Sequence, residues 1–144
     1  MIDVVNNDLL TIEIQQLMIP AEDVASVQTY HSLEHALLML IKAKYSAIPV
    51  LDEKGRVQGT ISKTLILDSI LGLERIETEK LSERTVEEVM DRGVPRLREA
   101  DAFFKALELS INRPFICVEN NEANFVGLLT RRAILILVYK HFRK

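Results

Sequence analysis

The chain has 144 residues, of which 48% are hydrophobic, and its formal net charge at pH 7 is -3. This length suits one domain or two very small units that share a core, and the acidic balance argues against a basic surface for nucleic acid. The single Cys117 excludes an internal disulfide, and no apolar stretch is long enough to span a bilayer. The first ten residues lack the basic region and apolar run of a signal peptide. We therefore expect a cytoplasmic protein.

The first half of the chain reads as an alternation of helices and strands. A helix is expected in "IQQLMIP" (14–20) and a short strand in "VASVQ" (24–28). Ser32 is a good N-cap for a helix whose apolar residues recur at helical spacing from Leu33 to Ile41. Two strands follow, "AIPVL" (47–51) and "VQGTI" (57–61), joined by a polar turn and closed by a further helix after Ser62.

The second half repeats this order after a charged linker at 72–84. A capping box, Thr85 with Glu88, begins the helix in "VEEVMDR" (86–92). "VPRLR" (94–98) is expected as an edge strand because proline cannot donate to a ladder, and Asp101 is expected to cap the next helix. The strands "PFICV" (114–118) and "FVGLL" (125–129) and a last helix after Thr130 complete the series.

The two halves align as an internal duplication. Gly59 and Gly127 take matching positions, as do Met18 and Met90, and the offset drifts between 67 and 72 residues. A repeat of this size cannot easily bury its own sheet face, so we expect two repeats packed as one pseudo-twofold α/β pair. The boundaries expected are 12–71 and 85–142, and a cleft between the two halves is the expected ligand site.

The repeated motifs resemble those of the cystathionine β-synthase (CBS) domain. They read "LMIP", "IPVLD" and "GTIS" in the first repeat and "VMDR", "FICVE" and "GLLT" in the second, and the resemblance covers residues 12–142. It implies a tandem CBS pair, a Bateman module, that binds an adenosine-containing ligand between its repeats and regulates without catalysing. CBS pairs commonly dimerise into a disc, so a homodimer is implied as well.

The words "LGLERIE" (71–77), "KYSAIPVLD" (44–52) and the late "TRR" (130–132) narrow the resemblance to the stand-alone cyclic-di-AMP-binding CBS-pair proteins of Gram-positive bacteria. The implied partner is a stringent-response nucleotide synthetase, engaged when no ligand is bound. The ligand-binding residues that the resemblance implies here are Ala25, Val27, Tyr45, Ser46, Ala47, Ile48, Thr130, Arg131 and Arg132.

The two arginines have a physical reason to stand where they do. The first turn of a helix already carries partial positive charge, and backbone N–H groups there form an anion site. Arg131 and Arg132 add two full charges, which match the two phosphates of cyclic-di-AMP. The plain alternative is that both simply lie in solvent. Glu22 and Asp23 would repel such a dianion, so we expect them to face water.

Two other functions stay open. CBS domains that bind AMP, ADP or ATP resemble each other in an aspartate that holds the ribose hydroxyls, three residues after the hydroxyl residue. That position is Leu65 in the first repeat and Ala133 in the second, which weighs against a mononucleotide. The third reading is a ligand-free interaction module in which the arginines dock an acidic partner.

For the remaining candidate residues, a functional role and an ordinary structural role are both considered. Adenines should be read mainly by backbone near Ala25, while Tyr45 either stacks on a base or forms the edge of the core. His31 and His35 have the spacing of metal ligands, but no third ligand is evident. Cys117 reads as a small buried hydrophobe, and no catalytic motif occurs, so no metal, cofactor or enzymatic activity is expected.

The apolar residues Ile134, Leu135 and Val138 of the last helix have two readings. They either form a contact between two copies of the chain or belong to the core of their own repeat.

Overall fold

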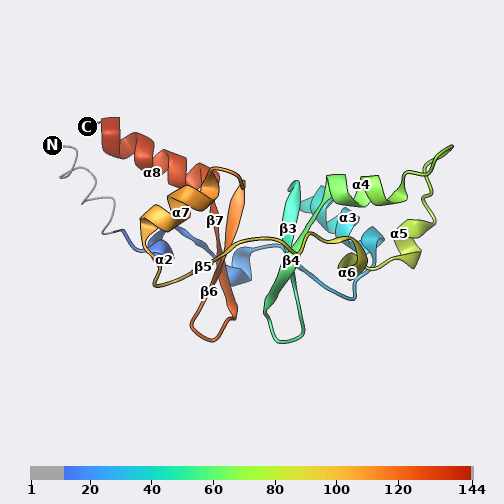
Figure 1. Cartoon of the computed structure of the whole chain (residues 1–144), viewed down its shortest axis with the longest axis horizontal. Coiled ribbons are helices and arrows are strands. Elements are labelled where there is room, and N and C mark those ends of the chain that lie inside the picture. The colour runs from blue at the N-terminus through green and yellow to red at the C-terminus, as the bar shows by residue number, and fades with distance from the viewer. Residues whose placement is uncertain (1–11, 144) are drawn as a thin grey trace. The chain divides into compact units, whose positions relative to one another are not determined.

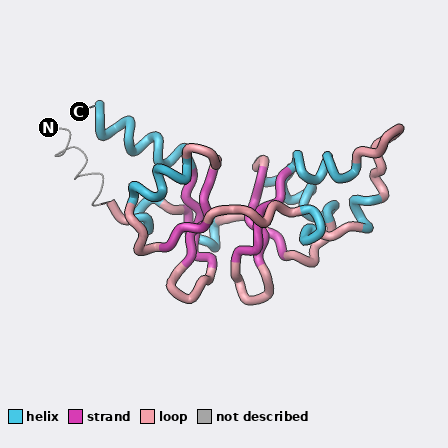
Figure 2. The backbone as a smooth tube through the Cα atoms, viewed as in Figure 1, coloured by secondary structure: helices cyan, strands magenta, loops and turns pink. Residues whose placement is uncertain are grey.

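The computed structural model describes residues 12–143, and the N-terminal stretch that lacks signal-peptide features lies outside this range (Figure 1). The chain is an α/β protein with two sheets, each built around an antiparallel pair of strands with helices against it (Figure 2). Two compact units are present. One contains residues 25–94, and the other combines residues 12–24 with residues 95–143.

The unit of residues 25–94 contains a three-stranded sheet in the order β2-β3-β4. The short edge strand β2 runs parallel to β3, with Val27 opposite Val50, and β3 runs antiparallel to β4. Its core is built from alternate strand residues and one face of each helix, as the hydrophobic periodicity predicts. Its elements are β2 (Val27–Gln28), α3 (Leu33–Ala43), β3 (Ala47–Leu51), β4 (Val57–Ser62), α4 (Lys63–Ile70), α5 (Lys80–Glu83) and α6 (Val86–Val89).

The second unit contains a four-stranded sheet in the order β1-β7-β6-β5. Here β5 pairs in parallel with β6 at one edge, which confirms the edge position predicted from Pro95. Its elements are α2 (Ile14–Leu17), β1 (Ile19–Pro20), the 3-10 turn η1 (Ala21–Asp23), β5 (Arg96–Arg98), α7 (Phe103–Ser110), β6 (Phe115–Glu119), β7 (Phe125–Thr130) and α8 (Arg131–Arg143).

The compact units do not coincide with the sequence repeats, because the short helix that begins each repeat, α2 or α6, belongs to the other repeat's unit. Ile14 is buried in the core that Phe103 and Ile134 share, whereas Val86 and Met90 are buried with Leu33 and Ile66. Each leading helix therefore completes the core of the other repeat. The charged stretch 72–84 lies inside the first unit, where Leu81 of α5 packs against the core.

The matching glycines explain how the leading segments fit. A Cβ on Gly127 would lie 2.6 Å from Met18 Sδ and 2.7 Å from the Ile19 carbonyl oxygen. A Cβ on Gly59 would collide with the Asp91 carbonyl oxygen. Glycine thus permits the close approach of the exchanged backbone at both places.

The turn between the two hairpin strands is the same in both repeats. Asp52 and Asn120 each accept two backbone N–H bonds through a side-chain oxygen, at 2.8–3.0 Å. The left-handed position that follows is Gly55 in the first hairpin, with φ of 78°, and Ala123 in the second, with φ of 64°. The second turn therefore puts an alanine where the first has glycine, a conformation that strains a side chain with a Cβ.

Two of the three predicted helix caps are confirmed. Ser32 Oγ accepts from the His35 N–H, and Thr85 and Glu88 form the capping box of α6. The prediction for Asp101 is wrong, because α7 begins after Ala102, which makes no side-chain cap. The Asp101 carboxylate instead accepts from the Arg98 N–H at 2.8 Å and closes the turn after β5. This return bond competes with capping for the same oxygens.

Candidate functional site

The carboxy-terminal corner is formed where β7 passes into α8. Thr130 Oγ1 accepts from the Ala133 N–H at 3.0 Å and so caps the helix, while the Arg131 N–H donates to the Pro114 carbonyl at 2.9 Å. Arg132 is exposed, and within residues 12–143 its guanidinium makes no hydrogen bond or ion pair. This corner therefore presents a full positive charge to solvent at a helix N-terminus, where backbone N–H groups already favour anions.

Arg131 differs from Arg132 because the fold already uses its side chain. Its Nε donates to the Ser110 carbonyl oxygen at 2.8 Å, and Ser110 is the last residue of α7 and is buried. A cation at a helix C-terminus stabilises the unpaired carbonyls there. The carbonyl is uncharged and occupies one of the five N–H donors of the guanidinium, so Arg131 retains its charge and other donors for an anion.

The second set of implied ligand residues lies in the unit of residues 25–94. Val27 and Ile48 are buried in its core, and Ala25 packs against that core. Their side chains therefore serve packing, and only their main chain is suited to meet a ligand. Because β2 is an edge strand, the main-chain groups on its outer side are outside the ladder and suit the hydrogen-bonding edge of a purine.

Tyr45, Ser46 and Ala47 stand at the entrance to β3. The Tyr45 side chain is 46% exposed, so its ring is accessible from solvent, as both its stacking reading and its core-edge reading allow. Ser46 is exposed, and its carbonyl oxygen accepts from the Lys63 N–H at 3.0 Å, so the start of α4 fixes this segment. An accessible aromatic ring beside an ordered main chain is suited to stacking on a base.

The structure brings the implied residues together as two sets, each within one unit: residues 25–48 in one, and Thr130 with the two arginines in the other. Lys63 is a basic residue that the sequence reasoning passed over. Its N–H bonds the Ser46 carbonyl as that of Arg131 bonds the Pro114 carbonyl, so it is the counterpart of Arg131 in the first repeat. Aligning Ser62 with Thr130 would have found it.

The starts of α4 and α8 have the same kind of helix cap. Both lack an acidic residue at the position where mononucleotide-binding CBS domains have the aspartate that holds the ribose. Ser62 Oγ accepts from the Leu65 N–H at 3.1 Å, as Thr130 does from Ala133. Leu65 packs against the core of its unit, and neither Leu65 nor Ala133 carries a side-chain acceptor. Glu22 and Asp23 are exposed, which confirms that they face water.

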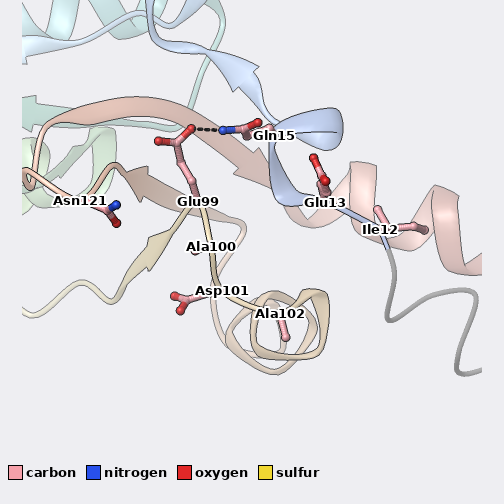
Figure 3. Close-up of a pocket in the computed structure, with 8 residues that line it drawn as sticks. All are labelled: Ile12, Glu13, Gln15, Glu99, Ala100, Asp101, Ala102 and Asn121. Atoms are coloured by element: carbon pink, nitrogen blue, oxygen red, sulfur yellow. Dashed lines mark hydrogen bonds between the residues drawn. The ribbon is translucent and has the colours of Figure 1, made fainter.

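A separate hollow of about 500 Å³ is lined by residues at the start of α2 and by the turn around Asp101 (Figure 3). Glu13, Glu99 and Asp101 line it, and Gln15 Nε2 donates to the Glu99 carboxylate at 2.5 Å. The hydrogen bond from the Arg98 N–H lowers the pKa of Asp101, so its carboxylate is charged at neutral pH. Three acids repel an anionic ligand, and the hollow contains none of the implied ligand residues.

Cys117 and the histidine pair have structural roles. Burial raises the pKa of the Cys117 thiol to about 12, as expected for a small buried hydrophobe rather than a nucleophile. The His31 and His35 rings lie 4.1 Å apart, and His31 Nδ1 accepts from the Gln28 N–H. Burial, with the nearby His35, lowers the pKa of His31. Among residues 12–143, no group of three or more His, Cys, Asp or Glu is placed to hold a metal.

Two of the three apolar residues of α8 that the sequence singled out belong to the core of their own unit, and for Leu135 the contact between copies stays a prediction. Ile134 is fully buried and Val138 packs against the same core, whereas Leu135 is 55% exposed. Within the described part of the chain, no helix is long and apolar enough to cross a membrane.

Two α/β units, each with an antiparallel hairpin, a parallel edge strand and a hydroxyl-capped helix corner, define a CBS pair. The CBS domain family model matches residues 14–72. The chain is 49% identical over 143 residues to the cyclic di-AMP receptor B of Bacillus subtilis (strain 168), a match that covers 99% of this chain and 97% of the relative. The protein therefore belongs to the CBS-domain family.

Solved structures agree with this assignment. A CBS domain-containing protein from Bacillus anthracis str. Ames Ancestor superposes with a TM-score of 0.88 at 52% identity, over 94% of this chain and 98% of that one. The CbpB protein of Listeria monocytogenes, solved in complex with c-di-AMP, superposes with a TM-score of 0.83 at 42% identity, over 90% and 97% of the two chains.

Proposed function

We propose that this protein is a non-catalytic sensor that binds cyclic-di-AMP. The observation that carries the proposal is the exposed guanidinium of Arg132, unpaired within residues 12–143, at the hydroxyl-capped start of α8. An arginine bound to a phosphate oxygen makes a charge-assisted hydrogen bond, worth about 1.5–3 kcal/mol. The names of two similar proteins support the choice of ligand, since one is a cyclic di-AMP receptor and the other was solved with c-di-AMP.

The chemistry of the two helix corners favours a cyclic dinucleotide over a mononucleotide. In cyclic-di-AMP each 3′-hydroxyl is esterified, so the ligand offers no free vicinal diol for an aspartate to hold. Leu65 and Ala133 take the positions where such an aspartate would stand. A mononucleotide ribose would leave its diol without a protein acceptor there, and unmade buried hydrogen bonds weaken binding.

The proposed contacts divide by chemistry. Arg131, Arg132 and Thr130 contact phosphate, while the main chain at Ala25 and Val27 reads an adenine edge. In this proposal Tyr45 stacks on a base, and residues 46–48 line the same ligand through their main chain. Base stacking on an aromatic ring is worth roughly 1–3 kcal/mol.

Regulation then follows from linkage. A partner that prefers the ligand-free form is released when the dinucleotide binds. The partner's affinity can fall by no more than the factor by which the ligand's affinities for the two forms differ. The family resemblance implies a stringent-response nucleotide synthetase as this partner. We further propose a cytoplasmic homodimer, supported by exposed apolar side chains on the helices of both units, such as Leu67 and Leu135.

Calorimetric titration tests the ligand. We expect saturable heat with cyclic-di-AMP and none with AMP, ADP or ATP at the same concentrations. The matched variant is Tyr45→Ala, which removes the exposed ring from the proposed stacking contact and should weaken binding by about tenfold, while the melting temperature of the free protein stays close to that of the wild type. Micromolar ATP binding without cyclic-di-AMP binding would overturn the proposal, and so would the absence of binding heat with every nucleotide.

A further inference from the structure

The outer edge of β2 is closed by one residue, His31. The Gln28 N–H donates to His31 Nδ1 at 2.9 Å, and the His31 N–H donates back to the Gln28 carbonyl oxygen at 3.2 Å. The next amide, that of Thr29, donates to the Leu51 carbonyl of β3 at 3.2 Å, so Gln28 faces away from the sheet, as alternate residues of a strand do. His31 thus satisfies both main-chain groups that this edge would otherwise leave unpaired.

The main chain around His31 is held by the segment that leads into α6. The His31 carbonyl oxygen accepts from the Val86 N–H at 2.8 Å, and the Leu33 N–H donates to the Arg84 carbonyl oxygen at 3.0 Å. These bonds fix the main chain from which the imidazole ring extends. The position of the ring relative to Gln28 is therefore set by the fold of this unit.

The strand that His31 closes is the one that the proposed ligand site uses. Ala25 and Val27 offer the main chain expected to read an adenine edge, and β2 itself has only two residues, Val27 and Gln28. Strands in proteins are usually longer, so a two-residue edge strand has few ladder bonds to hold it. The bonds to His31 are then a large share of those that fix this segment, and losing one of them loosens it.

His31 Nδ1 can accept from Gln28 only while it carries no proton. A neutral imidazole has one N–H and one acceptor nitrogen, whereas the imidazolium has two N–H groups and no acceptor. Protonation would therefore place two N–H groups against each other. Burial and, second, the nearby His35 lower the pKa of His31 from its usual 6.5, because the His35 ring lies only 4.1 Å away. The fold thus favours the neutral ring that the bond requires.

The acids near His31 are engaged elsewhere. Glu88 pairs with Arg84 at 3.3 Å, and Glu87 pairs with Arg92 at 3.6 Å. Within residues 12–143 no carboxylate forms an ion pair with His31, so none compensates a proton on its ring. The ionisable side chains on the segments around the ring are Tyr30, Glu34, His35, Asp52, Arg84, Glu87 and Glu88.

We infer that His31 is a positioning residue for the cyclic-di-AMP site, which holds β2 through Nδ1 and releases it when the ring is protonated. This inference rests on the proposed function and adds its regulation by pH. Because the fold lowers the pKa of His31, the bond is intact above pH 6.5 and is lost as the pH falls below that value. By reciprocity, bound ligand should make His31 still harder to protonate.

Calorimetric titration with cyclic-di-AMP between about pH 5.5 and about pH 8 tests the inference. Wild-type affinity should fall about 2–12-fold toward low pH, the factor that one hydrogen bond of ordinary strength allows. His31→Asn should keep its affinity at low pH, since its amide oxygen accepts a bond and takes up no proton. His31→Leu, which has no acceptor, should bind weakly at every pH. His141→Asn is the matched control, a histidine of the other unit that should leave the pH profile unchanged.

The outcomes separate this inference from the proposed function. Absence of cyclic-di-AMP binding at about pH 8 would refute the proposed function and the inference with it. Binding at about pH 8 with a flat wild-type profile, or with the same fall in His31→Asn, would overturn the role of His31 alone. The NMR resonance of the Gln28 amide adds a readout that needs no ligand. It should shift as the pH falls in the wild type and stay fixed in His31→Asn, and an unresponsive wild-type amide would also overturn the inference.

Discussion

The two neighbouring arginines of the α8 corner should respond differently to the same substitution. Arg131 Nε donates to the Ser110 carbonyl oxygen at 2.8 Å, whereas Arg132 is exposed and has no partner within residues 12–143. Arg132→Ala should therefore leave stability almost unchanged and weaken cyclic-di-AMP binding by about tenfold or more, through loss of one charge-assisted bond. Arg131→Ala should lower both stability and affinity.

The size of the stability effect follows from the bond that is lost. A hydrogen bond that involves a charged group contributes roughly 1.5–3 kcal/mol, and partial exposure of Arg131 places this one nearer 1–2 kcal/mol. For a chain of this length, 1 kcal/mol shifts the melting temperature by about 3–4 °C. We therefore expect Arg131→Ala to melt about 3–8 °C below the wild type, and Arg132→Ala to melt within about 1 °C of it.

Thermal melts of the free proteins and calorimetric titrations with cyclic-di-AMP measure the two effects. Lys140→Ala is the matched control, since it removes an exposed cation near the other end of α8 and should change neither quantity. If Arg131→Ala melts with the wild type, the bond to Ser110 contributes nothing in solution. If Arg132→Ala binds the ligand with unchanged affinity, the phosphate assignment is wrong.

Three further predictions follow from the fold. Gly127→Val should destabilise the protein by about 1–3 kcal/mol in urea unfolding, because its Cβ would crowd Met18 Sδ at 2.6 Å; unchanged stability would refute the close approach of β1. Ala123→Gly should raise stability by up to about 1 kcal/mol and Gly55→Ala should lower it by a similar amount, since both sites have positive φ; equal effects of one sign would contradict this reasoning. Cys117 should resist thiol reagents at pH 8 in the folded protein and react once unfolded, because burial raises its pKa to about 12; fast native labelling would show an open thiol.

Local patterns in the sequence were sufficient for the elements and for part of the candidate site. Alternating apolar residues predict the hairpin strands, and the hydroxyls of Ser62 and Thr130 mark the helix starts that the structure has. Pro95 predicts an edge strand because it lacks an N–H. The sequence also predicts the positive charge of Arg132 at the start of the last helix, and the structure leaves this side chain exposed and without a partner within residues 12–143.

Other features depend on partners far away in the chain. The sequence contains no local sign that Arg131 would reach Ser110, or that the Asp101 carboxylate would bond back to Arg98 instead of capping α7. Nor does spacing distinguish Val27 and Ile48, which are buried, from the exposed Tyr45 beside them. Such choices are made by competition among contacts that only a packed chain brings within reach.

The sequence by itself determined that this protein is a duplicated α/β chain with a cationic final corner, because periodicity, turn residues and charge are local properties. Tertiary structure alone decided which leading helix completes which core. Ile14 and Val86 each begin a four-residue helix, IQQL and VEEV, and neither short sequence specifies which core its helix enters. The exchange is settled by long-range packing, at Gly59 and Gly127, where backbone from the other repeat lies too close for any side chain.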